Sequence, residues 1–199
     1  MTAKPKTLTT SALVKTINST HQGYEVIVGQ CVPYFDYENT PEEAEHVKTL
    51  ILKIQTVYPK GKIIVFNASN ATKTSYHFIV RGAGYYNQGY DIPRLDGFDH
   101  AGYKRAGKRQ LFRLPFCSKE KQNRPLVRFV SDERSQFCCK AVKTIRDFHY
   151  TCDDLESCAD LNETIEDYLI TNVKGETLLE PAGQVGCGKV GCDVDVDVQ

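Results

Sequence analysis

Between residues 24 and 80 the chain alternates strand-like apolar runs with one amphipathic segment, and this order limits the folds open to it. Apolar or alternating runs of about four to eight residues are typical of strands, whereas apolar residues that recur every three to four positions are typical of a helix. The strand-like runs are residues 24–28, 31–38, 62–66 and 75–80. Their alternation with a helix predicts an α/β or α+β domain.

The segment after residue 38 carries the clearest helix signals in the chain. Thr40 is a good N-cap, Pro41 suits the first helical position, and Glu43 completes a capping box with Thr40. Pro59 and Gly61 mark the end of the helix. The apolar residues at helical spacing between these signals are Val47, Leu50, Ile51, Ile54 and Val57. The sequence therefore predicts a helix that starts at Pro41 and stops before Pro59.

The segment beyond residue 81 reads as a long loop followed by short elements. Residues 82–97 are rich in Gly, Tyr and Asn, which is typical of a loop. The elements expected after it are strands at 111–114 and 126–130, a helix at 135–148, and a strand or helix at 165–173.

The length and composition are those of a single soluble domain. The 199 residues are 41% hydrophobic and 25% charged. No stretch approaches the roughly 18 apolar residues of a membrane span, and the N-terminus lacks the apolar core of a secretory signal, so we expect an intracellular protein. We expect one folded domain over residues 21–180, between a flexible segment at 1–20 and a low-order tail at 181–199 that would lead to a further domain.

The eight cysteines show no clear zinc-ligand spacing. Cys138 and Cys139 are adjacent, and Cys187 and Cys192 lie near the end of the chain. In a reducing compartment such residues are free thiols more often than disulfides. We predict that the cysteines take no part in chemistry, and a zinc site is the alternative.

Positive charge is concentrated in one segment although the formal net charge is zero. The only acid between residues 104 and 128 is Glu120. The basic residues of this segment are Lys104, Arg105, Lys108, Arg109, Arg113, Lys119, Lys121, Arg124 and Arg128. The concentration favours contact with phosphate groups, and a solvated charged face is the alternative.

Two acids, Asp36 and Glu38, stand two positions apart at the end of a predicted strand. Residues two apart in a strand project from the same face, so both carboxylates would point together. Two carboxylates held this close repel unless a cation lies between them. Oxygen ligands suit Mg²⁺ or Mn²⁺. The pair therefore predicts a divalent-metal site, although exposed acids at a strand end are a common alternative.

Two further groups are weak signals when taken singly. Ser75 and His77 also stand two apart on a predicted strand, and Lys73 precedes them, a set that suits a phosphate chain. Asp99 comes shortly before the basic segment, which would set a metal ligand beside cations that neutralise a triphosphate.

Taken in order, these motifs resemble those of the archaeo-eukaryotic primase-polymerase superfamily. The stretches that carry the resemblance are VPYFDYE, TKTSYHFIV and DHAGYKRAGKRQLFRLPFCSK, with IEDYLITNV further on. They span about residues 24–180, and the likeness is greatest to the eukaryotic repriming enzyme and to the primase part of viral primase-helicases. The resemblance implies a catalytic core of small sheets flanked by helices around a central cleft.

The resemblance also implies roles for individual residues. Asp36, Glu38 and Asp99 would be the catalytic acids and bind two Mg²⁺ or Mn²⁺ ions. The residues that would face the incoming nucleotide are Lys73, Ser75, His77, Arg113 and Lys119. The remaining basic candidates, for contact with template phosphates, are Arg105, Lys108, Arg109, Lys121 and Arg124.

The expected reaction is template-directed nucleotidyl transfer that makes primers, extends DNA, or both. Its partners would be single-stranded DNA, nucleoside triphosphates and a helicase in cis or in trans. Two positions are open: Gln110 stands where the family often has a basic residue, and Asp96 is the alternative to Asp99 as third acid. The rival functions are a two-metal nuclease and a nucleic-acid-binding module with a decayed active site.

Overall fold

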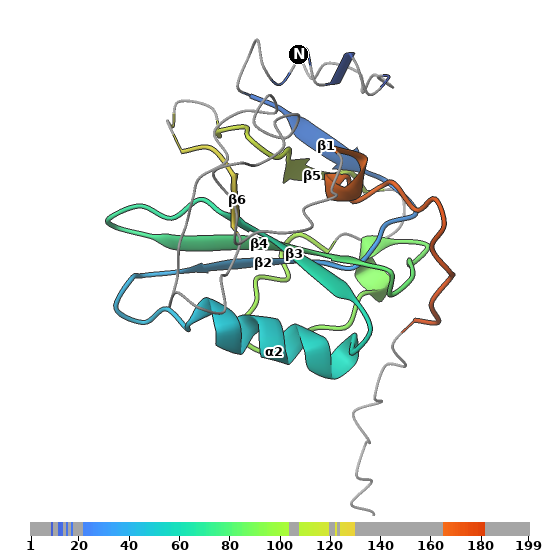
Figure 1. Ribbon diagram of the computed structural model, residues 1–199, viewed down its shortest axis with the longest axis horizontal. Coiled ribbons are helices and arrows are strands. Elements are labelled where there is room, and N and C mark those ends of the chain that lie inside the picture. Colours follow the sequence, from blue (N-terminus) through green and yellow to red (C-terminus); the bar gives the residue numbers. More distant parts are fainter. Residues whose placement is uncertain are drawn as a thin grey trace, which may run out of the picture.

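The computed structural model describes residues 22–103, 108–119, 122, 124–129 and 165–181, together with positions 9, 12, 13, 15 and 17 (Figure 1). Its elements in chain order are β1 Tyr24–Ile27, β2 Tyr34–Asn39, α2 Val47–Val57, β3 Lys62–Asn67, β4 Thr74–Arg81, the 3₁₀ turn η1 Gly89–Asp91, β5 Gln110–Arg113, β6 Val127–Phe129 and the 3₁₀ turn η3 Ile165–Tyr168.

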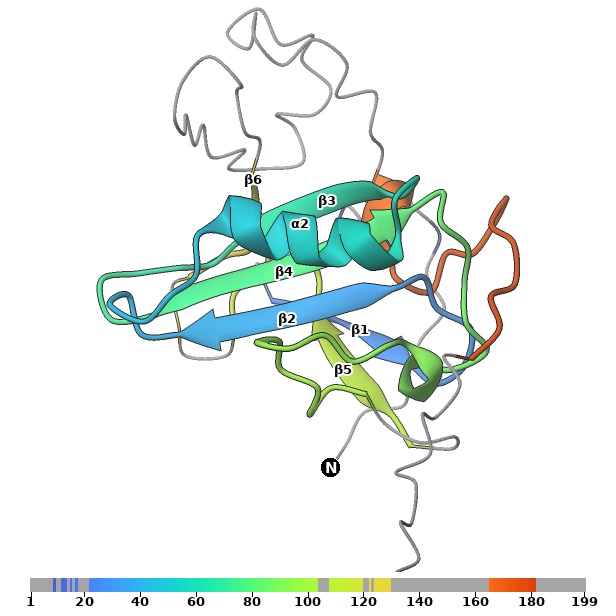
Figure 2. The same ribbon diagram turned by 90° about the horizontal axis from the view of Figure 1, so that it is seen from below.

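The strands form two antiparallel sheets. One has four strands in the order β2-β4-β3-β6, and the other pairs β1 with β5. Helix α2 covers one face of the four-stranded sheet, and the β1–β5 sheet and η3 lie on the other side (Figures 1 and 2). Helix and strand are thus mixed, as the sequence predicts, and the antiparallel pairing makes the described part α+β rather than a parallel α/β fold.

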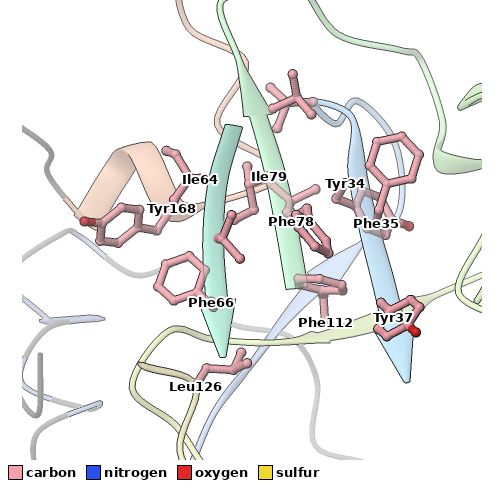
Figure 3. Packing of buried hydrophobic residues seen from close by; sticks show 14 of the residues in the cluster. Tyr34, Phe35, Tyr37, Ile64, Phe66, Phe78, Ile79, Phe112, Leu126 and Tyr168 are labelled. Atoms are coloured by element: carbon pink, nitrogen blue, oxygen red, sulfur yellow. The ribbon is translucent and has the colours of Figure 1, made fainter. Parts of the chain in front are cut away.

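The two faces of the four-stranded sheet have different chemistry because side chains alternate along a strand. On the face toward α2, Phe35 and Phe78 are buried, and the Phe35 ring lies 5.3 Å from that of Phe98. The opposite face carries Asp36, His77 and, further along, Phe66, whose ring meets Tyr168 of η3 edge-on at 5.0 Å (Figure 3). The face toward α2 is therefore mainly apolar, whereas the other combines a second apolar cluster with the acids.

Helix α2 begins at Val47, so the prediction that it starts at Pro41 is wrong. Side chains of β2 take the backbone groups that would have formed the earlier turns: Asn39 Nδ2 donates to the carbonyl of Glu43 at 3.1 Å, and the hydroxyl of Tyr37 accepts from the amide of Glu45 at 2.6 Å. The N-cap is His46, whose Nδ1 accepts from the amide of Lys48 at 3.3 Å.

The end of α2 is predicted correctly. The helix stops at Tyr58, directly before Pro59, and the turn closes at Gly61, whose amide donates to the Tyr58 carbonyl at 3.0 Å. The buried face of α2 is formed by Val47, Leu50 and Ile54. The predicted strands over 24–28, 62–66, 75–80, 111–114 and 126–130 are each present within a few residues of their expected bounds.

Residues 165–181 are fixed across both sheets by buried polar side chains. The guanidinium of Arg81, at the end of β4, donates to the backbone carbonyls of Glu166, Asp167, Leu169 and Asn172. From β1, the Glu25 carboxylate accepts the amides of Ile170 at 2.9 Å and Thr171 at 2.7 Å. The strand or helix expected over 165–173 is a single 3₁₀ turn, because backbone carbonyls here bond to Arg81 instead of extending a regular element.

Some predictions fall on residues outside the described ranges. These are the helix at 135–148, all but the first residue of the tail at 181–199, and most of the segment at 1–20. Leu13 and Ile17 of that first segment are described, and both are buried in the hydrophobic core. Within the described ranges, no helix combines the length and the apolar character needed to cross a bilayer.

Candidate active site

The register of β2 and β4 places two of the sequence motifs side by side. Asp36 pairs with His77 and Glu38 pairs with Ser75 across the two strands. Asp36 Oδ1 lies 3.4 Å from His77 Nε2, although the two atoms do not have hydrogen-bond geometry. The acids of β2 and the two β4 residues that we expect to contact phosphate, Ser75 and His77, therefore share one sheet face. More than 30 positions separate the two pairs in the sequence.

Asp99 joins this face by its backbone. Its amide donates to the carbonyl of Asp36 at 2.8 Å, which forms an isolated antiparallel bridge at the exposed edge of β2. The Asp99 carboxylate accepts from the amide of Ala101 at 2.8 Å. Asp96, the alternative third acid, is exposed and does not line the pocket. The geometry thus favours Asp99 over Asp96 as the acid closest to Asp36.

A cavity of about 120 Å³ lies between the two sheets at this point. Its lining combines acids, bases and aromatic rings: Tyr24, Tyr34, Asp36, His77, Asp99, Gly102, Tyr103, Gln110, Leu111, Phe112, Arg113 and Lys119. A concave site of mixed polarity with ionisable groups is the kind of pocket in which ligand binding and catalysis occur.

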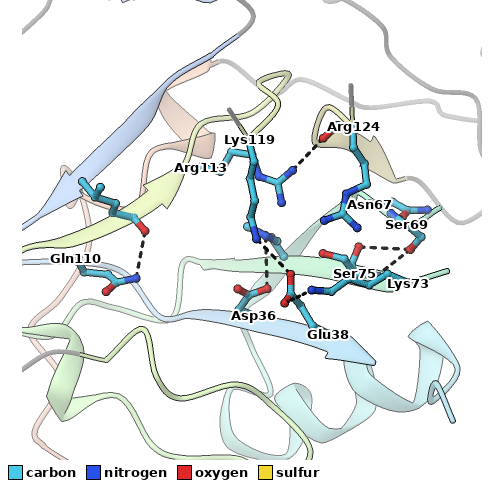
Figure 4. Close-up of polar contacts among 12 residues, drawn as sticks. Asp36, Glu38, Asn67, Ser69, Lys73, Ser75, Gln110, Arg113, Lys119 and Arg124 are labelled. Carbon is cyan, nitrogen blue, oxygen red and sulfur yellow. Dashed lines mark hydrogen bonds and ion pairs between the residues drawn. The ribbon is translucent and has the colours of Figure 1, made fainter. Parts of the chain in front are cut away.

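Glu38 is held between two lysines at the edge of this pocket (Figure 4). Lys73 Nζ contacts Glu38 Oε2, and Lys119 Nζ lies 3.4 Å from Glu38 Oε1. Burial alone would raise the pKa of Glu38, but the hydrogen bond from Lys73 and the charge of Lys119 hold this pKa below its usual value. Glu38 is therefore ionised at neutral pH and balanced by two cations.

Asp36 is in the opposite situation. Burial and the nearby charge of Glu38 raise the pKa of Asp36 to about 7, with a smaller contribution from Asp99, while Lys119 and Arg113 act against them. The Oδ1 atom of Asp36 is buried and accepts no hydrogen bond from the described residues. The ionised form of a buried carboxyl without hydrogen bonds is unfavourable unless a cation binds to it.

His77 is buried and neutral. Burial lowers the pKa of His77 well below its usual value, and the charges of Arg113, Lys119 and Arg124 lower it further. Its ring lies 4.6 Å from the ring of Phe112 on β5, centroid to centroid. Neither ring nitrogen has a hydrogen-bond partner among the described residues, so a neutral donor or acceptor is available to a ligand.

Arg113 brings to the site a buried guanidinium with two donors unused within the described part of the chain. Its side chain is buried, and Nη1 donates to the carbonyl of Arg124 at 2.9 Å, while Nε and Nη2 have no partner among the described residues. Burial lowers the pKa of Arg113, and the adjacent Arg124 lowers it further. Buried guanidinium donors without partners are costly, so they indicate an anionic ligand.

The three acids fit a divalent metal by chemistry. Carboxylate oxygens are the ligands that Mg²⁺ and Mn²⁺ prefer, and the orphaned Oδ1 of Asp36 is a buried oxygen that a cation would satisfy. As they stand, the described residues form no cluster of three or more His, Cys, Asp or Glu side chains close enough to hold a metal. The reason is that Glu38 turns to its lysines and Asp99 to the amide of Ala101.

The remaining site predictions divide into three groups. Lys108 and Arg109 are exposed and lie just before β5, beside the pocket. Arg105 and Lys121 lie outside the described residues. Arg124, which the sequence places with the template contacts, is half-buried next to Arg113.

Sequence reasoning missed the aromatic lining of the pocket. Tyr34 stands two positions before Asp36 on β2, so strand alternation was a signal that placed both on one face. Tyr24 had no such signal, because it reaches the pocket only through its pairing with Arg113 across β1 and β5. Cys31 and Cys117 are free, buried thiols, and the other six cysteines lie outside the described residues.

Comparison with known proteins adds no assignment. No model of a known protein family matches the chain, and no curated protein matches it significantly. The functional conclusion therefore rests on the order of the motifs and on the geometry of the pocket.

Proposed function

We propose that this protein catalyses template-directed nucleotidyl transfer, as a DNA primase-polymerase that makes primers, extends DNA, or both. The observation that carries the proposal is the pairing of Asp36 with His77 and of Glu38 with Ser75 in one strand register, with Asp99 bonded to Asp36. Residues of three motifs that are separate in sequence thus lie together beside one cavity, which supports the proposal.

The charge distribution around the cavity supports a nucleoside triphosphate as the substrate. Two acids, Asp36 and Asp99, and two bases, Arg113 and Lys119, line the cavity together. Arg113 and Lys119, together with Lys73, Ser75 and His77, would bind the triphosphate and offset its charge. The 3′-hydroxyl of a primer or first nucleotide would attack the α-phosphorus and lose its proton. The bond between the α-phosphorus and the oxygen that bridges to the β-phosphate would break, and pyrophosphate would leave.

Asp36, Glu38 and Asp99 would hold two Mg²⁺ or Mn²⁺ ions. Metal bound by these residues would supply positive charge to offset the negative charge that develops on the attacking and leaving oxygens. The protein's own part is to hold Asp36 and Glu38 on one sheet face, with Asp99 bonded to Asp36, beside a cavity between the two sheets. Since Glu38 is now balanced by Lys73 and Lys119, metal binding would release at least one of these lysines toward the phosphates.

Aromatic side chains in the pocket would contact the sugar or the base of a nucleotide. Tyr24 and Phe112 line the cavity from the β1–β5 sheet and Tyr34 lines it from β2, with the Tyr34 and Phe112 rings 5.1 Å apart. Rings of this kind receive a sugar or a base by stacking and van der Waals contact. The exposed Lys108 and Arg109 lie close enough along the chain to hold phosphates of a single-stranded DNA template. A helicase in cis or in trans would supply that single strand.

The deciding experiment is nucleotide incorporation on unprimed and primed single-stranded DNA. Reactions would contain Mg²⁺ or Mn²⁺ with either ribonucleotides or deoxyribonucleotides. We expect products that need both a template and a divalent metal, and that disappear in Asp36→Ala. Degradation of the DNA without nucleotides would instead indicate a two-metal nuclease. Binding of DNA with no incorporation under any condition would indicate a nucleic-acid-binding module.

A further inference from the structure

Two arginine side chains meet at the basic end of the site. The carbonyl of Arg124 accepts from Arg113 Nη1 at 2.9 Å, and the amide of Arg124 donates to the hydroxyl of Ser118 at 3.1 Å. Arg113 and Ser118 are both buried. The position of Arg124 is therefore fixed through its backbone.

The donors of these two arginines are only partly used. Within the described residues, Nε and Nη2 of Arg113 and Nε and Nη1 of Arg124 are buried without hydrogen-bond partners. The one side-chain contact of Arg124 is a long one, from Nη2 to Gln122 Oε1 at 3.5 Å. Two cations that are neighbours and retain four buried, unpaired donors are stable only when an anion lies between them.

Further unpartnered groups face the same place from β4. Ser75 is 0% exposed and His77 is 3% exposed, and the Ser75 hydroxyl and both His77 nitrogens lack partners among the described residues. The charge of Arg124 acts on both His77 and Arg113, which places its guanidinium near both. Figure 4 shows the Arg124 side chain extending from the segment before β6 toward the strand that carries Ser75.

From this cluster the site extends past the acids toward Gln110 (Figure 4). Gln110 lies at the other end, with Asp36 and Glu38 between it and Arg124 (Figure 4). Gln110 and Tyr24 line the cavity, whereas Arg124 lies beyond its lining. A nucleotide whose base lies toward Gln110 and whose α-phosphate meets the acids would direct the far end of its phosphate chain at Arg124.

We infer that Arg124, together with Arg113 and Ser75, binds the terminal phosphate of a polyphosphate chain, and so selects triphosphates over shorter nucleotides. Arg124 would then be a specificity residue for the nucleotide and not a template contact. This inference deepens the proposed function, on which its biological meaning rests. The site itself requires only an anion of three linked phosphates.

The test compares binding in the full chain and in Arg124→Ala by calorimetry, without template and therefore without turnover. The probes are a deoxynucleoside mono-, di- and triphosphate and inorganic tripolyphosphate. Loss of a charge-assisted contact predicts triphosphate and tripolyphosphate binding weaker by roughly 10- to 100-fold. Monophosphate binding should change by less than about threefold. Arg94→Ala, which removes an equal charge from an exposed loop position, should leave all four affinities unchanged.

The outcomes separate this inference from the proposed function. Equal weakening of mono-, di- and triphosphate, or an unchanged triphosphate affinity with weaker binding of single-stranded DNA, would overturn the assignment of Arg124. If the chain never incorporates nucleotides but Arg124→Ala still loses tripolyphosphate, the polymerase proposal fails and the phosphate site stands. Arg124→Lys retains the charge without the planar fork, so it should show an intermediate affinity for tripolyphosphate.

Discussion

Asp36 and His77 occupy opposite positions in the antiparallel register of β2 and β4, with Asp36 Oδ1 3.4 Å from His77 Nε2. The same register sets Phe35 against Phe78 on the other face, where both are buried. A slip of one residue would move every side chain of one strand to the opposite face. The apolar core under α2 and the chemistry of the pocket are therefore specified by a single pairing.

Removal of any one of the three acids should abolish nucleotide incorporation while the fold survives. Asp36→Ala, Glu38→Ala and Asp99→Ala should each lower the rate on the order of 10² or more, because metal position and electrostatics supply most of the catalysis. The measurements are incorporation rate, Mn²⁺ affinity and a thermal unfolding curve for each variant. Asp96→Ala is the control and should be active, since Asp96 is exposed away from the pocket lining. Near-normal incorporation by Asp36→Ala would refute the proposed function.

Arg113→Ala and Lys119→Ala should weaken nucleotide binding more than template binding. Both residues line the cavity, and Arg113 retains two buried donors without partners among the described residues. Each charge-assisted contact contributes about 1.5–3 kcal/mol, so nucleotide affinity should fall roughly tenfold or more. Fluorescence anisotropy with a labelled nucleotide and with a labelled oligonucleotide measures the two affinities separately. A fall in oligonucleotide affinity alone would instead identify these residues with a template groove.

Asp36 should make the metal-free protein less stable as pH rises. Its pKa is raised from 3.8 to about 7 in the folded protein, so between these values the folded chain holds a proton that the unfolded chain has released. The free energy of unfolding therefore decreases from about pH 4 to about pH 7. Asp36→Asn removes this titration, although Glu38, Asp99, Lys119 and Arg113 still face the position.

Urea unfolding in the presence of a chelator measures this effect across the pH range. The stability of Asp36→Asn relative to the natural chain should increase steadily from pH 4 to pH 7 and then level off. Parallel stability curves for the two proteins would show that Asp36 ionises freely in the folded state.

Arg81→Ala should destabilise the fold strongly. The Arg81 guanidinium donates to four backbone carbonyls of residues 166–172 and lies 3.9 Å from the Glu176 carboxylate. Its loss leaves the four carbonyls without their donor and removes the positive charge beside Glu176, which should lower the free energy of unfolding by about 3 kcal/mol or more. Chemical denaturation measures the change. Arg94→Ala, at an exposed position, should stay within about 0.5 kcal/mol of the natural chain.

Cys31 and Cys117 should resist thiol reagents in the folded protein. Both are 0% exposed, and burial raises the pKa of Cys31 to about 12 and that of Cys117 to about 11. The reactive thiolate is thus scarce at neutral pH, and reagents cannot reach the sulfur. Peptide mass spectrometry after iodoacetamide treatment should show labelling of these two residues only in urea. Rapid labelling of either one in the native state would contradict their burial.

The local pattern of the sequence determined the strands and much of the pocket face. Alternation along 31–38 and 75–80 was enough to put Asp36 with Glu38, and Ser75 with His77, on common faces. This works because a strand's side-chain period is a property of the backbone and needs no tertiary partner. The end of α2 was predictable for the same reason, since Pro59 cannot continue a helix.

The tertiary structure alone decided where those faces meet. The start of α2 moved to Val47 because Asn39 and Tyr37 bond to the backbone that the capping box at Thr40 would have used. Such side-chain bonds depend on how β2 is oriented, which a local pattern does not contain.

Sequence periodicity also could not predict two contacts in the site. These are the contact of Asp99 with Asp36 and that of Arg124 with Arg113. The first is a single backbone hydrogen bond between distant segments, and the second depends on the loop between β5 and β6. Charge composition identified a basic segment but not which of its members would be buried. That outcome is decided by the packing of the two sheets, because desolvation acts only on groups that the fold encloses.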